Sequence, residues 1–198
     1  ITKIIIPESV EEIQESAFER CIQIQYIILP NSLKIIGNKA FCRCYKLAYV
    51  ALNDELKEIG DEAFGFCGKL KVISINKELE KVSTTAFNNC SQLMEFSIHD
   101  ENDHYSVKEG ILYDYDIKRI IRCLENYCHD VVSIPSTVVT IEEWCFSRCL
   151  KLIDIMLPKM LENVCAHAFH DCCNIPSITL GDNIKKFDIS ALDGWNDH

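Results

Sequence analysis

The side chains best suited to metal chemistry lie together in one short stretch. Residues 165–173 read Cys-Ala-His-Ala-Phe-His-Asp-Cys-Cys. His167 and His170 are three residues apart, and zinc is commonly held by His and Cys side chains. However, the repeats described below align Lys39 and Glu62 with His167, which are residues typical of a solvated position. The favoured interpretation is therefore a pair of surface histidines, and we expect no metal site.

The sequence shows no recognisable pattern of catalytic residues. Nucleophilic catalysis needs a Ser or Cys beside a His and an orienting acid, and the sequence assembles no such set. Asp114 and Asp116 flank a short polar segment that a tight turn explains without catalysis. There is no G-x-G-x-x-G pattern and no phosphate-binding P-loop. We expect a protein that is not an enzyme and that uses no cofactor.

Cysteine instead marks a repeat. Six of the 12 cysteines recur at one constant spacing in two runs: Cys21, Cys44, Cys67 and Cys90, then Cys149 and Cys172. An Ala-Phe pair precedes each of them, with Cys145-Phe146 as the one variant. A fixed period, here about 23 residues, is typical of a solenoid, in which each repeat is one coil that cannot fold alone.

Each coil is expected to begin with a short strand. With the repeated cysteine as coil position 0, positions 6 and 8 are apolar: Ile27/Leu29, Val50/Leu52, Ile73/Ile75, Phe96/Ile98, Ile155/Leu157 and Ile178/Leu180. Apolar residues two apart, with freer residues between them, predict a strand with one buried face. Pro30 and Pro158 at position 9 end that strand.

A turn and a short helical segment are expected to complete the coil. A second apolar pair follows the strand, as in Leu33 and Ile36, and Gly37 and Gly60 suit a turn with positive φ. The segment with the Ala-Phe pair has room for one or two helical turns. We expect the Phe to fill the coil interior and the Ala to permit close approach of the next coil.

An insertion interrupts the pattern at residues 99–125. Its apolar runs 111–113 and 120–121 are separated by Asp114-Tyr115-Asp116, which predicts a β-hairpin or an extra strand pair that extends the sheet. Two interpretations stay open, a decorated coil and a dedicated recognition element, because insertions in rigid scaffolds often carry contacts.

The length and net charge of the chain limit its domain organisation and its possible partners. The 198 residues suffice for about eight coils in a single domain over residues 1–198, and the net charge of −10 disfavours nucleic acid and anionic membranes as partners. No apolar run approaches the length that a membrane-spanning helix needs, so we expect no membrane insertion. The chain opens inside a repeat, without an initiator Met or a signal peptide, so we expect a piece of a longer protein.

The repeat resembles a known family. The pattern IPxSVxxIxxxAFxxC, present from Ile6 to Cys21 and in related form from Leu29 to Cys44, is similar to the BspA-like leucine-rich repeat. The insertion YSVKEGILYDYDIKRII resembles the hairpin unit that interrupts such arrays. The resemblance covers nearly the whole chain. It implies a right-handed α/β leucine-rich-repeat solenoid from a cell-surface or secreted protein, often adhesive and usually without catalytic residues.

The cysteines leave the redox compartment open. The shared position of the six repeated cysteines favours small buried thiols, and disulfides between adjacent coils are the alternative. Cys123 and Cys128, at the exit of the insertion, are the pair best placed to form a bridge.

Binding is expected on the outward face of the strands. Positions 5 and 7 point away from the coil interior, and over the first four coils they are apolar and aromatic. The candidate ligand-binding residues are Ile5, Tyr26, Ile28, Tyr49 and Val72. Exposed apolar patches mark contact sites, and Tyr is a favoured interface anchor. Contact with further coils, or simple strand preference, would also explain these residues.

These observations favour a non-catalytic scaffold that binds a protein or glycan ligand at a cell surface. One alternative is a structural spacer without a ligand of its own. The other is an intracellular protein-interaction module with reduced cysteines.

Overall fold

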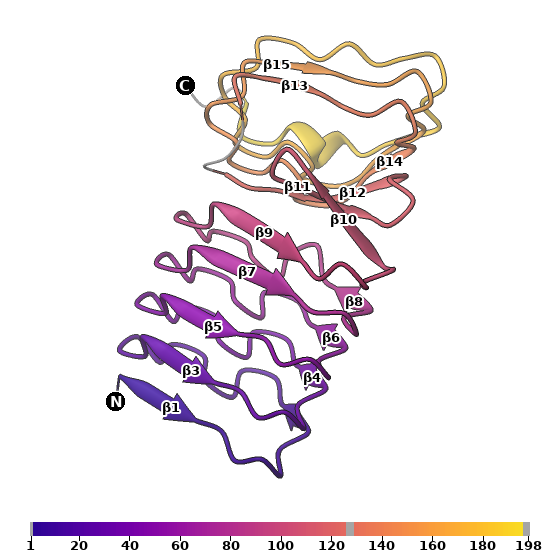
Figure 1. Cartoon of the computed structure of the whole chain (residues 1–198). Helices are drawn as coiled ribbons and strands as arrows, with labels where there is room; N and C mark the ends of the chain where they lie inside the picture. The colour runs from indigo at the N-terminus through magenta and orange to yellow at the C-terminus, as the bar shows by residue number, and fades with distance from the viewer. Residues whose placement is uncertain (1, 126–128, 196–198) are drawn as a thin grey trace. The chain divides into compact units, whose positions relative to one another are not determined.

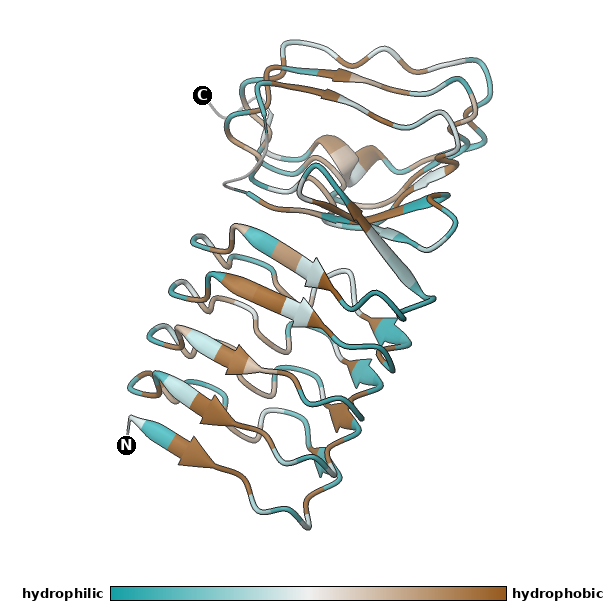
Figure 2. Cartoon of the chain, in the orientation of Figure 1, coloured by the Kyte–Doolittle hydropathy of each residue, from teal (hydrophilic) through white to brown (hydrophobic). Residues whose placement is uncertain are grey.

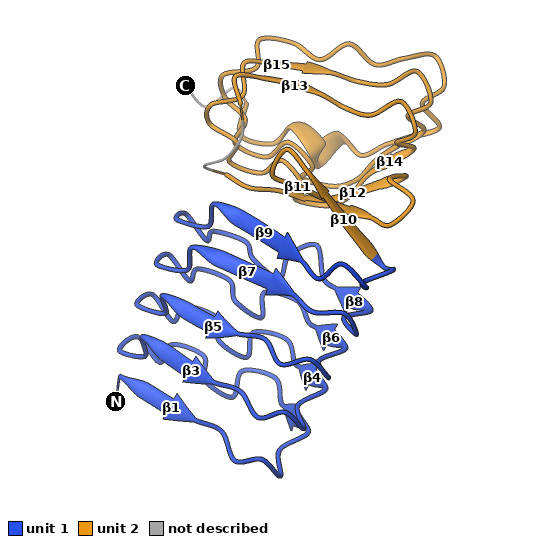
Figure 3. Ribbon diagram, viewed as in Figure 1, with its two compact units in different colours: residues 1–104 blue, residues 105–198 orange. Residues whose placement is uncertain are grey.

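The computed structural model describes residues 2–125 and 129–195. The chain divides into two compact units, Ile1–His104 (unit 1) and Tyr105–His198 (unit 2), which Figure 3 colours separately. Both are built from coils of short strands and tight turns, and each is described here by itself (Figure 1). The described residues include no helix with the length and apolar character to cross a bilayer.

The first row of strands in unit 1 confirms the predicted strand of each coil. It consists of β1 (Lys3–Ile5), β3 (Tyr26–Ile28), β5 (Tyr49–Ala51), β7 (Val72–Ile75) and β9 (Glu95–Ile98). Parallel pairing joins β1 to β3 to β5 and β7 to β9, and each residue faces its equivalent in the next coil. Ile27 and Val50 are buried while their neighbours point outward, as the alternation predicts. We call this row the front sheet of unit 1.

A second row of strands was not predicted. The later apolar residues of each coil form two-residue strands: β2 (Glu12–Ile13), β4 (Ile35–Ile36), β6 (Glu58–Ile59) and β8 (Lys81–Val82). Their parallel ladder again pairs equivalent positions of neighbouring coils. Each coil of unit 1 therefore crosses between two sheets, and apolar residues from both fill its interior.

Unit 2 repeats this cross-section with fewer front strands. Its strands are β10 (Tyr105–Lys108), β11 (Ile111–Asp114), β12 (Arg119–Cys123), β13 (Val131–Ser133), β14 (Thr140–Ile141), β15 (Asp154–Met156), β16 (Asn163–Val164) and β17 (Lys186–Phe187). The front pair is β13–β15, and the other six strands form one sheet in the order β10-β11-β12-β14-β16-β17.

The insertion forms a three-stranded meander. The predicted strand pair is present as β11 and β12, which are antiparallel, and the Asp114 side chain closes their turn by accepting from Lys118 N at 2.8 Å and Arg119 N at 2.9 Å. β10 is an additional strand, joined to β11 through Glu109 and Gly110, both at positive φ. β12 then pairs in parallel with β14, so the insertion extends the second sheet of unit 2 and not its front pair.

Stacked phenylalanines fill the coil interiors, as predicted. The ring of Phe41 lies between those of Phe18 and Phe64, with centroid distances of 5.2 and 5.4 Å, and Phe146 stacks on Phe169 at 5.3 Å. The alanines beside them are fully buried from the second coil onward, which allows the backbones of neighbouring coils to approach. Stacked aromatic pairs add to the free energy gained by burial alone.

Four of the repeated cysteines at coil position 0 are hydrogen-bond donors. The thiols of Cys44, Cys67, Cys90 and Cys172 donate to the carbonyl oxygen of the Phe in the preceding coil, at 3.2, 3.3, 3.0 and 2.9 Å. In the last coil Trp195 replaces cysteine, and its indole Nε1 donates to Phe169 O at 2.8 Å. Coil position 0 therefore requires a side chain that can donate a hydrogen bond to the Phe carbonyl of the preceding coil. Every described cysteine is a free thiol; Cys128, and with it the candidate Cys123–Cys128 pair, lies outside the described residues.

The predicted short helical segment is wrong. The Ala-Phe segment is a succession of turns, and the one helix among the described residues is the 3₁₀ helix η1 (Ile189–Leu192). Coil positions 18 and 22 adopt positive φ without glycine, as at Lys39 and Arg43. Phe41 N donates across to Ala63 O of the next coil at 2.8 Å. Backbone groups that bond between coils are not available for helical bonds within one coil.

The predicted role of Gly37 and Gly60 is also wrong. Neither glycine has positive φ. A Cβ at Gly37 would lie 2.9 Å from both Glu15 N and Ile13 O of the preceding coil. Gly37 is therefore required for close backbone approach between coils, and the left-handed residue of the turn comes two places later.

Buried asparagines close the front strands of unit 1. Asn53 Nδ2 donates to Asn31 O at 3.0 Å and to Leu33 O at 2.8 Å. Asn76 Nδ2 donates to Asn53 O and Leu56 O, and Asn102 Nδ2 donates to Asn76 O at 2.8 Å. This asparagine ladder ties the ends of β5, β7 and β9 to the coil before each of them, whereas Pro7 and Pro30 follow β1 and β3. The described coils of unit 2 have Pro135, Pro158 and Gly181 at coil position 9 and lack the ladder.

Candidate functional site

The predicted binding residues gather on the front sheet of unit 1. The parallel register aligns Lys3, Tyr26 and Tyr49 in one row and Ile5, Ile28 and Ala51 in the next. We call the predicted residues the aromatic patch: Ile5, Tyr26, Ile28, Tyr49 and Val72. Their exposed fractions run from 38% at Val72 to 65% at Ile5, which is high for large apolar side chains on a sheet.

The aromatic patch borders a shallow hollow. Lys3, Tyr26, Ile28, Tyr49 and Ala51 line it, together with Ile27 and Leu29 at its floor. Small Ala51 leaves room beside Ile28, while the two tyrosines stand on adjacent strands (Figure 1). The hollow is therefore apolar at its base, with two phenol hydroxyls and one ammonium group at its side.

The front pair of unit 2 lacks such a patch. Val131 lies opposite Asp154, and Ser133 lies opposite Met156. Positions 5 and 7 become polar within unit 1, at Ser74, Glu95 and Ser97, and Figure 2 shows the start of β9 as hydrophilic.

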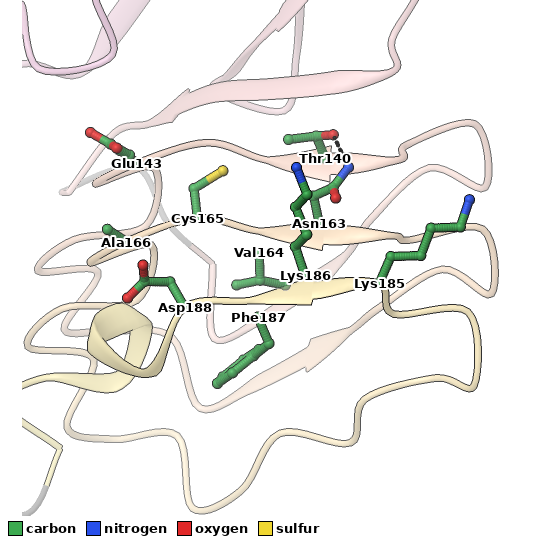
Figure 4. Close-up of a pocket in the computed structure, with 10 residues that line it drawn as sticks. All are labelled: Thr140, Glu143, Asn163, Val164, Cys165, Ala166, Lys185, Lys186, Phe187 and Asp188. Carbon is green, nitrogen blue, oxygen red and sulfur yellow. Dashed lines mark hydrogen bonds between the residues drawn. The ribbon is translucent and has the colours of Figure 1, made fainter.

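A second hollow lies on the second sheet of unit 2. Figure 4 shows Thr140, Asn163 and Lys186 grouped on β14, β16 and β17, with Asp188 at the other end. Asn163 Nδ2 donates to Thr140 Oγ1 at 3.1 Å, and Asp188 accepts from Ser190 N and Oγ. These contacts hold the polar side chains to one another within the unit.

The one thiol in that hollow is not an activated nucleophile. Burial raises the pKa of Cys165, and the carboxylates of Glu142 and Glu143 raise it further. A reactive cysteine needs a lowered pKa, because the thiolate is the attacking species. The second hollow therefore offers no support for nucleophilic catalysis.

The two histidines considered as metal ligands lie against an aromatic ring. The His167 ring stacks on Trp144 at 4.3 Å, and His170 lies 5.1 Å from the same indole. His167 Nδ1 lies 3.3 Å from Asp193 Oδ2 but without hydrogen-bond geometry. Among the described residues, no three His, Cys, Asp or Glu side chains are arranged to hold a metal ion. The histidines are half-buried packing groups, which is more enclosed than the predicted surface pair.

Comparison with protein families gives one match. The model of the BspA type leucine rich repeat region matches residues 1–114 and 122–196, in six copies. No curated protein matches the sequence.

Several solved bacterial structures share the fold. The pneumococcal vaccine antigen PcpA aligns with a TM-score of 0.80 at 20% identity, over 98% of this chain and 60% of its own. A leucine-rich repeat protein from Eubacterium ventriosum aligns with a TM-score of 0.81 at 17% identity, over 94% of this chain and 55% of its own. A leucine rich cell surface protein from Faecalibacterium prausnitzii gives 0.52 at 18% identity, over 98% and 71%. The chain thus spans less than two thirds of the length of the first two structures.

Proposed function

Because this chain belongs to the BspA-type leucine-rich-repeat family, we propose that it is a non-catalytic recognition scaffold that binds a protein or glycan through the front sheet of unit 1. The observation that carries the proposal is the aromatic patch. Ile5, Tyr26, Ile28 and Tyr49 stand exposed in register on β1, β3 and β5, and Val72 is exposed on β7; the coil interior needs none of them.

The chemistry of the patch suits recognition. Tyr26 and Tyr49 each offer a rigid apolar ring with a hydroxyl group that can donate or accept a hydrogen bond. Side chains of this kind dominate binding energy when a partner covers them. The rigid parallel ladder of β1, β3 and β5 fixes their spacing before binding, which lowers the entropic cost of association.

We also propose that the chain acts at a cell surface or as part of a secreted protein. Membership of the family supports this location, and so does the presence of a vaccine antigen and a cell surface protein among the structural neighbours. Free thiols in the described part of the chain are consistent with either this location or a reducing compartment.

A structural spacer is the second candidate. The front pair of unit 2 favours it, because its outward face has no aromatic anchor and its exposed Val131 and Met156 each lie opposite a polar residue. In that role the coils would separate other domains and bind nothing themselves.

The test compares wild type with Tyr26→Ser plus Tyr49→Ser in binding to immobilised matrix proteins, plasma proteins and glycans. The matched control is Tyr115→Ser plus Val131→Ser, since Tyr115 is as exposed as Tyr49, at 57%. We expect saturable binding that falls at least about tenfold in the patch variant only. Equal affinity in the patch variant, or no binding by any form, would contradict the proposal and leave the spacer.

A further inference from the structure

A group of lysines borders the aromatic patch. Lys46 and Lys69 occupy coil position 2, Lys71 occupies position 4, and Lys3 begins the row of Tyr26 and Tyr49. All four side chains are exposed, and all lie where the front strands of unit 1 begin. We call Lys3, Lys46, Lys69 and Lys71 the basic edge.

The basic edge differs from the lysines on the second sheet of unit 1. There Lys34 pairs with Glu11 at 2.9 Å, Lys57 with Glu80 at 2.9 Å and Lys81 with Glu58 at 2.6 Å. Within the described residues, none of the four lysines of the basic edge forms an ion pair; Lys46 Nζ only donates to Gln23 Oε1 at 2.8 Å. Their positive charge is therefore available to a partner.

Carboxylates gather at the other end of the same strands. Glu8 follows β1, Asp54 and Glu55 follow β5, and Glu78 follows β7, all at positions 10 and 11. Lys77 also lies there but contacts Glu78 at 3.8 Å. From β1 to β7 the front sheet of unit 1 is thus apolar in the middle, basic where its strands begin and acidic after β1, β5 and β7, whereas β9 begins with Glu95.

The structure assigns this face to an acidic protein segment: one with apolar side chains to fill the hollow and Asp or Glu side chains beside them that meet the basic edge. This rests on the proposed function of the front sheet. A net charge of −10 repels acidic partners in general, so attraction is confined to the place where unpaired lysines lie beside the patch. A glycan chain carries no apolar side chains to fill the hollow, so the combination favours a protein segment.

The same positions in unit 2 are not basic. Lys151 occupies position 2, but Asp130 and Asp154 occupy positions 4 and 5. The basic edge and the aromatic patch therefore occur together in unit 1, and the front pair of unit 2 has neither. We expect the acidic segment to bind unit 1 alone.

The test selects random linear peptides displayed on phage against wild type, and then measures enriched peptides on three variants. The first is Lys46→Gln plus Lys69→Gln plus Lys71→Gln, which removes most of the basic edge. The control, Lys34→Gln plus Lys57→Gln plus Lys81→Gln, removes the same charge from the second sheet. The third is Tyr26→Ser plus Tyr49→Ser. Circular dichroism checks that each variant is folded.

We expect the enriched peptides to combine apolar residues with Asp or Glu. Their affinity should fall about tenfold in the basic-edge variant, remain near wild type in the control, and weaken with added salt. Replacing Asp and Glu of the peptide with Asn and Gln should cause the same loss.

Other outcomes separate the two proposals. Peptides that require the tyrosines but bind the basic-edge variant as well as wild type overturn the acidic segment and leave the proposed function standing. If the selection enriches no peptide whose binding depends on Tyr26 and Tyr49, both the acidic segment and the proposed function are contradicted. Heparin binding that needs the basic edge and ignores the tyrosines, without any enriched peptide, would identify an anionic glycan site in place of the acidic segment.

Discussion

Units 1 and 2 have the same type of packing inside their coils, and they differ in the side chains that they expose to solvent. Phe64 in unit 1 and Phe146 in unit 2 lie in equivalent stacks, and Cys67 and Cys172 donate to equivalent carbonyls. The outward positions of the first front strands of unit 1 carry Tyr26, Ile28 and Tyr49. In the front pair of unit 2 they carry no aromatic residue, and the exposed Val131 and Met156 alternate with Asp154 and Ser133. Packing therefore constrains the inward positions in both units, while the outward positions are free to specify a partner.

The units also close their front strands differently. In unit 1 Pro7 and Pro30 follow β1 and β3, and the buried asparagine ladder closes β5, β7 and β9. The described coils of unit 2 have proline or glycine at coil position 9 and no such asparagine. The asparagine ladder satisfies backbone carbonyls that would otherwise be buried without a donor, and so it adds constraints between coils. The front sheet that carries the aromatic patch is the one held by these extra bonds.

The largest expected loss of stability comes from truncating a stacked phenylalanine, and it tests whether the phenylalanine stacks of the two units are equivalent. Phe64→Ala should lower the free energy of unfolding by about 3–5 kcal/mol, because it leaves a cavity between Phe41 and Phe87. Phe146→Ala should cost a similar amount in unit 2. Urea unfolding followed by circular dichroism measures both. Phe66→Ala, at a half-exposed ring, is the control and should cost much less; equal costs for Phe64 and Phe66 would refute the equivalence of the stacks.

A smaller effect tests the difference in strand closure. Asn76→Ala should cost about 1–3 kcal/mol, because the carbonyls of Asn53 and Leu56 lose their donor. Pro158→Ala, at the same coil position in unit 2, breaks no such bond and should change stability little. Urea unfolding and amide hydrogen exchange of β5 and β7 check this. A neutral Asn76→Ala would mean that the asparagine ladder does not distinguish the units.

The effect that is smallest near neutral pH concerns the buried thiols of both units. Burial raises the pKa of Cys44 to about 12 and places the pKa of Cys67 and Cys145 well above the ordinary 9.0. Above pH 9 the unfolded chain loses protons that the folded chain keeps. Stability should therefore be complete below pH 9 and fall as the pH rises toward 12, by up to about 1.4 kcal/mol per pH unit for each thiol.

The measurement is the urea midpoint in a reducing buffer at a series of pH values above 8. Cys67→Ala should show a shallower decline than wild type, and Cys145→Ala should do the same for unit 2. Cys173→Ala, at a half-exposed position, is the control. Identical slopes in all four proteins would contradict a contribution from buried thiols.

The repeat made much of this architecture predictable. Alternation at positions 6 and 8 placed the front strands correctly, and the Ala-Phe pair placed Phe41 and Phe64 in the interior. The apolar runs of the insertion predicted β11 and β12. The second sheet was missed because two-residue strands such as β4 carry no periodicity of their own. Its signal was the apolar residue shared by Ile36, Ile59 and Val82 at one coil position.

The asparagine ladder was also missed, although a signal existed. Asn53 and Asn76 share the coil position of Pro30, and an amide in place of a proline indicates that the position needs a donor or a turn. The basic edge was overlooked because its lysines occupy three different coil positions. Only the fold shows that they share one border of the front sheet and that Lys34, Lys57 and Lys81 on the second sheet are paired.

The sequence by itself determined the period, the inward residues and the outward candidates, because stacked coils impose one register on every equivalent position. Only the tertiary structure decided what the turns do. Non-glycine residues at Lys39 and Arg43 take positive φ, and Gly37 does not, since backbone groups bond to the neighbouring coil. Such bonds join residues a whole coil apart in the sequence, where local propensity has no influence.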